Sequence, residues 1–63
     1  MMDETRLTPG AVIYPAHNCK RTATVAEVGE DYVVTRRVSQ QKPHWPIYST
    51  EAKPFVLAHW EAE

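Results

Sequence analysis

Two runs of β-branched and aromatic residues lie on either side of a short turn in the middle of the chain. The first run covers residues 22–28 and the second covers residues 32–38, and Gly29, Glu30 and Asp31 join them. Such side chains suit a pleated, half-buried surface, and glycine can adopt the positive φ that a tight reversal requires. The pattern therefore predicts a β-hairpin that turns at Gly29.

The alternation within this hairpin is imperfect. Ala23 and Val25 fall on one face of the first strand and Val28 falls on the other, which predicts a bulge or a sharp twist near residues 26–27. Valines occupy both faces of the second strand. Strong twist with two partly buried faces is typical of a small curled barrel.

Turn-forming residues divide the rest of the chain. We expect residues 1–8, which are mostly polar, to be disordered, and residues 9–63 to form a single domain. A Pro-Gly turn leads into a strand expected over residues 11–14, which Pro15 ends because proline removes a ladder donor. A proline-bounded polar stretch then precedes a short strand expected over residues 47–49.

The last fifteen residues are compatible with either a strand or a helix. Ser49 or Thr50 can cap a helix that tolerates Pro54 in its first turn. A small sheet also needs a closing strand, on which Phe55 and Leu57 would share a face. We expect a closing strand or a short 3₁₀ turn, with a short C-terminal helix as the alternative. The predicted fold class is therefore mainly all-β, a small, strongly twisted antiparallel sheet of four or five strands.

The spacing of the turns and strands resembles that of small SH3-like barrels of the Tudor or KOW type. The resemblance covers residues 9–57 and rests on Pro9, Gly10, residues 11–14, residues 23–25, Val28, Gly29, residues 32–34, Trp45 and Phe55. It implies that the sheet is curled into an SH3-like barrel, and that loops at one edge bind peptides or nucleic acids. Neither the aromatic cage nor the basic ribosomal-type loop of such barrels matches a segment of this chain.

The chain has 63 residues, enough for one small domain that buries only about 60% of its unfolded surface. The core candidates are Val12, Ile13, Tyr14, Val25, Val28, Val33, Val34, Val38, Ile47, Tyr48, Phe55, Leu57 and one or both of Trp45 and Trp60. They suffice for one layered core but not for a deep pocket, so an enzyme would need oligomerisation to build a cleft. We expect a protein that is not an enzyme and has no catalytic residues.

Charge is nearly balanced, with seven Lys and Arg against eight Asp and Glu, a formal net charge of −1. This balance argues against a general polyanion binder. The basic residues gather in the middle of the chain, at Lys20, Arg21, Arg36, Arg37 and Lys42. They would form a phosphate-facing patch if the loop before the hairpin lies beside its second strand, although solvated charges that discourage aggregation are the alternative.

Arg36 and Arg37 are neighbours on a strand, so they point to opposite faces and we expect only one of them in any single patch. His44 and Trp45 lie between two prolines, which makes this loop the best candidate for a contact surface. A stiffened loop loses little entropy on binding, and tryptophan is frequent at interface hot spots. The alternative is that Trp45 folds down as a lid over an open barrel end.

These features favour a non-enzymatic interaction module, a small bacterial or phage accessory protein that docks onto another protein through the Trp45 loop. A second copy of the chain is a further expected partner, with Phe55 and Trp60 at the seam. The alternative is a nucleic-acid-binding barrel that uses the local basic patch and stacking by Trp45.

Cys19 is the only cysteine, so no internal disulfide can form, and with His17 it makes only one of the two ligand pairs that zinc normally needs. We expect no metal and no cofactor. The N-terminus carries charge where a signal peptide would be apolar, and every apolar run is too short to span a bilayer. We therefore expect a cytoplasmic location and no membrane partner.

Overall fold

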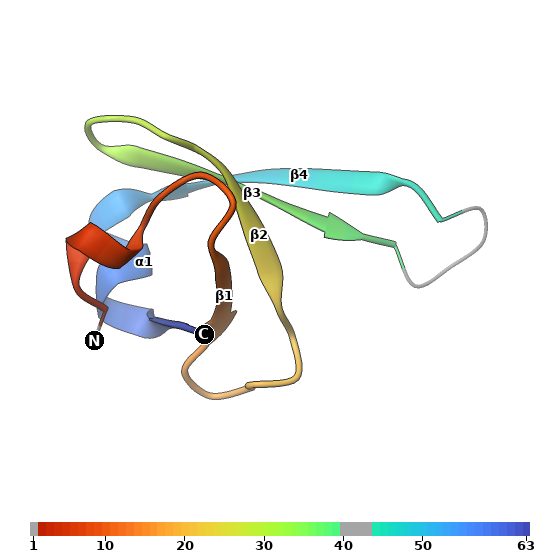
Figure 1. Ribbon diagram of the computed structural model, residues 1–63, viewed down its shortest axis with the longest axis horizontal. Coiled ribbons are helices and arrows are strands. Elements are labelled where there is room, and N and C mark those ends of the chain that lie inside the picture. Colours follow the sequence, from red (N-terminus) through yellow and green to blue (C-terminus); the bar gives the residue numbers. More distant parts are fainter. Residues whose placement is uncertain (1, 40–43) are drawn as a thin grey trace.

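The computed structural model describes residues 2–39 and 44–63 and contains one antiparallel sheet with the strand order β4-β3-β2-β1-β5. The elements are η1 (Glu4–Arg6, a 3₁₀ helix), β1 (Val12–Pro15), β2 (Ala23–Val28), β3 (Tyr32–Val38), β4 (Pro46–Ala52), α1 (Lys53–His59) and β5 (Trp60–Ala62). β1 to β4 pair in chain order, and α1 then leads back to β5 beside β1 (Figure 1). The predicted antiparallel, mainly β fold class is confirmed. The sheet is not closed into a barrel, because its edge strands β4 and β5 do not pair with each other.

The central hairpin is confirmed together with its irregularity. β2 and β3 pair at Val25 with Thr35 and at Val28 with Val33, and the register shifts between Val25 and Glu27. This shift is the predicted bulge. The turn closes where the Gly29 N–H donates to the Tyr32 carbonyl at 2.9 Å.

The reason for glycine at position 29 differs from the expectation. Among the described residues, only Gly10 has a positive φ, at 93°. At Gly29 a Cβ would instead overlap the ring of Tyr32. The Tyr32 hydroxyl donates to Glu27 Oε2 at 3.0 Å, which holds the ring across the turn. Gly29 is therefore required for close packing rather than for a left-handed backbone.

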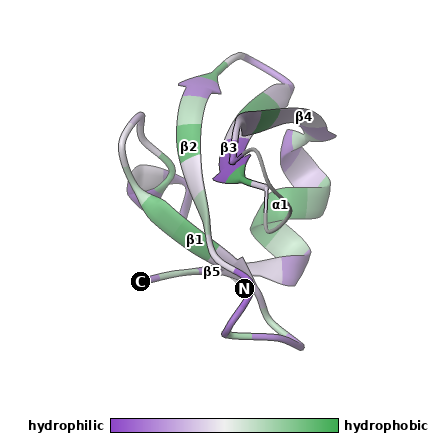
Figure 2. Cartoon of the chain, turned by 90° about the vertical axis from the view of Figure 1, so that its right-hand side faces the viewer, coloured by the Kyte–Doolittle hydropathy of each residue, from purple (hydrophilic) through white to green (hydrophobic). Residues whose placement is uncertain are grey.

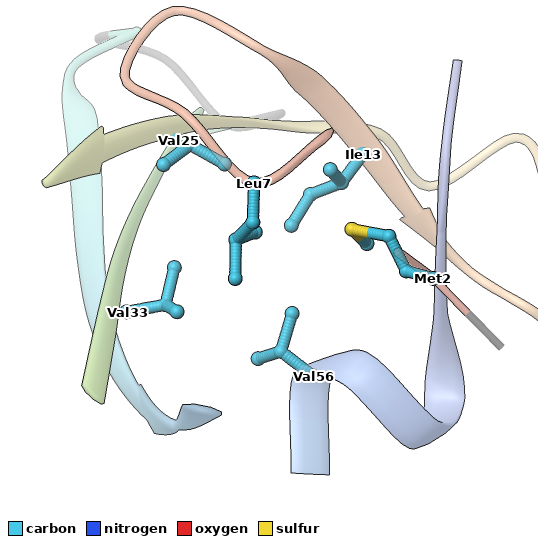
Figure 3. Close-up of a cluster of buried hydrophobic side chains, with 6 residues drawn as sticks. All are labelled: Met2, Leu7, Ile13, Val25, Val33 and Val56. Atoms are coloured by element: carbon cyan, nitrogen blue, oxygen red, sulfur yellow. The ribbon is translucent and has the colours of Figure 1, made fainter. Parts of the chain in front are cut away.

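The core lies between the inner face of the sheet, α1 and the N-terminal segment (Figure 3). Its buried apolar residues are Met2, Leu7, Ile13, Ala23, Val25, Val33 and Val56. Several predicted core residues lie at the surface instead, namely Val12, Val38, Tyr48 and Phe55, and of the two tryptophans Trp60 packs against the core while Trp45 is exposed. The register explains three of these corrections, because Val12, Val38 and Tyr48 alternate with inward-facing neighbours and so occupy the outer face of the sheet.

The N-terminal segment packs against the sheet, whereas we expected residues 1–8 to be disordered. Met2 and Leu7 are buried in the core, and the Met2 N–H donates to the Leu57 carbonyl at 2.8 Å. Asp3 caps the 3₁₀ turn by accepting the Thr5 N–H at 3.1 Å. Two apolar side chains thus hold an otherwise polar segment, because an open sheet of short valines leaves apolar surface for them to cover.

The C-terminal region contains both a helix and a strand. The expected closing strand is present as β5, where Ala62 pairs with Ile13 of β1. Phe55 and Leu57 lie in α1, however, so the expectation that they share a strand face was wrong. The proposed caps Ser49 and Thr50 belong to β4, which is longer than expected, and no side chain caps α1. No helix in the described part of the chain has the length and apolar character to cross a membrane.

Candidate functional site

An open hollow of about 900 Å³ lies beside the end of β3, the starts of β2 and β4, and the loop between β1 and β2. We call it the basic hollow. Its lining residues are Asn18, Lys20, Arg21, Thr22, Ala23, Thr24, Arg36, Arg37, Val38, Ser39 and Ile47.

Unequal strand pairing creates this space. The β2–β3 pairing reaches only as far as Thr24 and Arg36, whereas the β3–β4 pairing continues to Val38 and Pro46. Residues 37–39 and 44–47 therefore form an arm that extends past β2, and the arm projects from the rest of the sheet (Figure 1). The basic hollow lies between this arm and the loop that precedes β2.

The loop over residues 16–22 is organised around Asn18. The Asn18 N–H donates to the Pro15 carbonyl at 2.9 Å, and the Asn18 carbonyl accepts the Arg21 N–H at 3.2 Å. The Asn18 side chain accepts the Lys20 N–H, also at 3.2 Å. These bonds turn the chain so that Lys20 and Arg21 line the hollow. Sequence reasoning assigned Asn18 no role, although asparagine commonly bonds the backbone two residues on.

Four basic side chains line the hollow, those of Lys20, Arg21, Arg36 and Arg37, and no acidic residue of the described chain lines it. None of these four side chains makes an ion pair or hydrogen bond with the rest of the described residues. The structure thus brings together two basic pairs that lie 16 positions apart in the sequence.

The remaining described Lys and Arg side chains have intramolecular partners. Lys53 Nζ lies 2.7 Å from Glu4 Oε1 and donates to the Gly29 carbonyl at 3.1 Å. Arg6 donates to the Glu63 carbonyl at 3.3 Å. Among residues 2–39 and 44–63, the Lys and Arg side chains without a partner are therefore concentrated at the basic hollow.

The expectation that only one of Arg36 and Arg37 could join a patch was wrong, because both line the hollow. Their opposite orientation is confirmed, since Arg36 pairs with Tyr48 and Arg37 pairs with Ile47 on alternate positions. The hollow reaches both because it lies at the end of β3, where β2 no longer covers the strand edge. Lys42, the fifth predicted member of the patch, lies outside the described residues.

Trp45 lies on the arm beside the hollow and is 58% exposed. Its carbonyl accepts the Ser39 N–H at 3.0 Å, which continues the register that pairs Val38 with Pro46. Alternation along the strand then places Trp45 on the same side as Ile47, a lining residue. A ring this exposed does not act as a buried lid. His44 lies next to it, with Nδ1 2.7 Å from the Ser39 carbonyl oxygen.

Most acidic residues lie at the end of the molecule opposite the hollow, in the N-terminal segment and around the β2–β3 turn (Figure 1), whereas Glu61 and Glu63 lie on β5 and at the C-terminus, beside β1. In the N-terminal segment the Thr5 N–H lowers the pKa of the Asp3 carboxyl by hydrogen bonding to it. At the same end, the hydrogen bond to Glu27 raises the pKa of the Tyr32 hydroxyl. The molecule is therefore electrically polarised along its length.

Most of the strongly apolar segments lie around the core. Apolar residues concentrate on β1, on parts of β2 and β3, and on α1, which enclose the core (Figure 2). No group of three or more His, Cys, Asp and Glu in the described chain is placed to hold a metal ion. Cys19 is free and exposed.

No protein-family model, curated protein or solved structure matches this chain. The basic hollow must therefore be interpreted from its own residues.

Proposed function

We propose that this chain is a non-enzymatic interaction module that binds the phosphate backbone of nucleic acid in the basic hollow. The observation that carries the proposal is that four basic side chains, which have no hydrogen-bond or ion-pair partner among the described residues, converge on a concave surface that no described acidic residue lines. Phosphate contacts from Lys and Arg supply most of the affinity of nucleic-acid binding. Arginine forks bind phosphate oxygens in pairs, and lysine adds a mobile point charge.

The slightly negative net charge is compatible with this function because the charges are segregated. A ligand responds to the local field, and exposed charges farther than about 8 to 10 Å are largely screened at physiological salt. The acidic end therefore has little effect on an anion in the hollow. It would instead orient the molecule, with the basic end facing the polyanion.

Neutral lining groups fit the same ligand. Thr22 and Thr24 add hydroxyl groups beside the cations, and hydroxyl and amide side chains are common donors to phosphate and sugar oxygens. The described strands form a meander followed by a helical turn and a fifth strand that returns to β1, and the hollow lies at one edge, beside the β1–β2 loop.

The salt dependence of binding tests this proposal. A titration monitored by fluorescence anisotropy would measure the affinity for a labelled oligonucleotide between about 50 and 200 mM salt. With four phosphate contacts, we expect log K to fall with log salt at a slope of about −3, and Arg37→Ala to reduce that slope by about 0.7.

Arg6→Ala is the matched control, because it removes the same charge from an exposed arginine that lies outside the hollow. We expect this variant to keep the slope of the unmodified protein. Absence of binding at the lowest salt concentration would refute the proposal, as would an equal loss of slope in both variants.

A protein partner is the second candidate. It is favoured by two exposed aromatic residues, Tyr48 on β4 and Trp45 directly before it. Trp45 is 58% exposed and Tyr48 is 60% exposed, and aromatic side chains are frequent anchors of interfaces. In this alternative the chain is a bacterial or phage accessory protein of the cytoplasm, and the basic residues meet an acidic partner surface. A second copy of the chain would use Phe55, which is half-exposed, and light scattering would detect the dimer.

A further inference from the structure

We propose that the basic hollow takes one strand of unpaired nucleic acid rather than a duplex, with a base stacked on Trp45. This inference rests on the proposed function and adds the class of ligand. Three observations support it, namely the apolar part of the lining, the position of Trp45, and the placement of the cations on two sides of the hollow.

Apolar residues contribute to the lining alongside the cations. Ala23, Val38 and Ile47 line the hollow, and Val38 is 53% exposed. A phosphate group gains nothing from apolar surface, whereas the face of an unpaired base removes such surface from water. The bases of a duplex are already stacked on each other and cannot cover it. A ligand that combines phosphates with free bases matches both parts of the lining.

Trp45 provides a stacking surface next to the hollow, two residues before the lining residue Ile47. It shares the Ile47 side of the arm, its ring is more than half exposed, and its backbone is fixed by pairing with Ser39. Every base has an aromatic face, so stacking on a tryptophan requires an unpaired base but no particular sequence. A strand whose phosphates contact the hollow would place a neighbouring base within reach of the arm.

The cations approach from two elements. Lys20 and Arg21 come from the β1–β2 loop, and Arg36 and Arg37 come from the end of β3, so the hollow has basic residues on both sides. A single backbone can lie between two such walls. A duplex carries its phosphates on the outside of a wide cylinder and is read by protruding elements that enter its grooves, whereas this site is a hollow of about 900 Å³.

Four ligands of about twelve units test the inference on the full chain, a length within the range that small β domains cover on single strands. They are an oligothymidylate, an oligouridylate, an abasic phosphodiester of equal charge, and a duplex. We expect one or both of the pyrimidine single strands to bind about tenfold more tightly than the abasic backbone and than the duplex at equal salt.

Trp45→Ala should lower the affinity for the preferred single strand to that for the abasic backbone, and Trp45→Phe should retain part of the difference. Phe55→Ala is the control, because it removes an aromatic ring of similar exposure from α1. Circular dichroism would verify that each variant is folded.

The outcomes separate the two proposals. If the abasic backbone binds with salt dependence but the bases and Trp45 add nothing, the single-strand inference is overturned and the proposed function stands. Tighter binding of the duplex also overturns the inference. If none of the four ligands binds at low salt, the proposed function fails as well.

Discussion

Leu7 shows how single side chains stabilise an open sheet of small valines. It is only 3% exposed and lies in the core with Ile13, Val33 and Val56 (Figure 3). Removing a buried leucine side chain loses apolar burial and leaves a cavity.

We therefore expect Leu7→Ala to lower the free energy of unfolding by about 2 to 4 kcal/mol. Urea denaturation monitored by tryptophan fluorescence would measure this loss. Val38→Thr, a β-branched substitution at a half-exposed position, should change the free energy by less than about 0.5 kcal/mol. If Leu7→Ala is equally mild, the N-terminal segment does not belong to the core.

The sequence predicted which basic residues form a patch, but not how they are arranged around the hollow. Lys20, Arg21, Arg36 and Arg37 were all identified from the sequence as a candidate patch. The alternation of side chains correctly places Arg36 and Arg37 on opposite faces of β3. Both can nevertheless line one hollow when the hollow lies at an uncovered strand edge. The end of β3 pairs with β4 but not with β2, because the β2–β3 pairing stops at Thr24 and Arg36. The sequence does not show where this pairing stops. Met2 and Leu7 were missed because isolated apolar residues in a polar segment show no periodicity.

At the scale of elements, the β2–β3 turn depends on contact between two of its own residues. A Cβ at Gly29 would overlap the Tyr32 ring, which must then leave its position and its hydrogen bond to Glu27. We expect Gly29→Ala to be destabilising in the natural background and much less so in the Tyr32→Thr background. A double-mutant cycle in thermal unfolding would measure this coupling, which we expect to be about 0.5 to 2 kcal/mol.

Additive effects of Gly29→Ala and Tyr32→Thr would mean that the glycine is needed for its backbone rather than for packing. Gly10→Ala provides the comparison, because its positive φ is strained for alanine and no neighbouring atom lies near its Cβ. Its effect should be independent of residue 32.

The elements near the C-terminus illustrate the limit of local patterns. The hairpin was predictable because β-branched residues and a turn occur together over residues 22–38. α1 was predicted only as an alternative to a strand, because seven residues without a side-chain cap are too few to form a helix alone. Distant contacts fix it instead. Val56 is buried in the core, and Lys53 bonds the backbone of Asp31 and Gly29 and pairs with Glu4.

At the scale of the whole molecule, the important property is the separation of opposite charges. The 3₁₀ helix and the β2–β3 turn form the acidic end, and the arm and the β1–β2 loop form the basic end (Figure 1). Net charge averages over this separation, so it does not describe the local field at the hollow. The pairing of β2 with β3 was predictable from the sequence, but the openness of the sheet was not, because it depends on whether the two edge strands meet.

The central claim is that a polyanion binds between the β1–β2 loop and the arm. The most direct measurement is a titration of ¹⁵N-labelled protein with an unlabelled single-stranded oligonucleotide at low salt, followed by amide chemical-shift changes. We predict saturable shifts concentrated in residues 18–24, 36–39 and 45–47, with little change in α1 and the β2–β3 turn. Shifts centred on α1 or β5, or no shifts at all, would contradict the account.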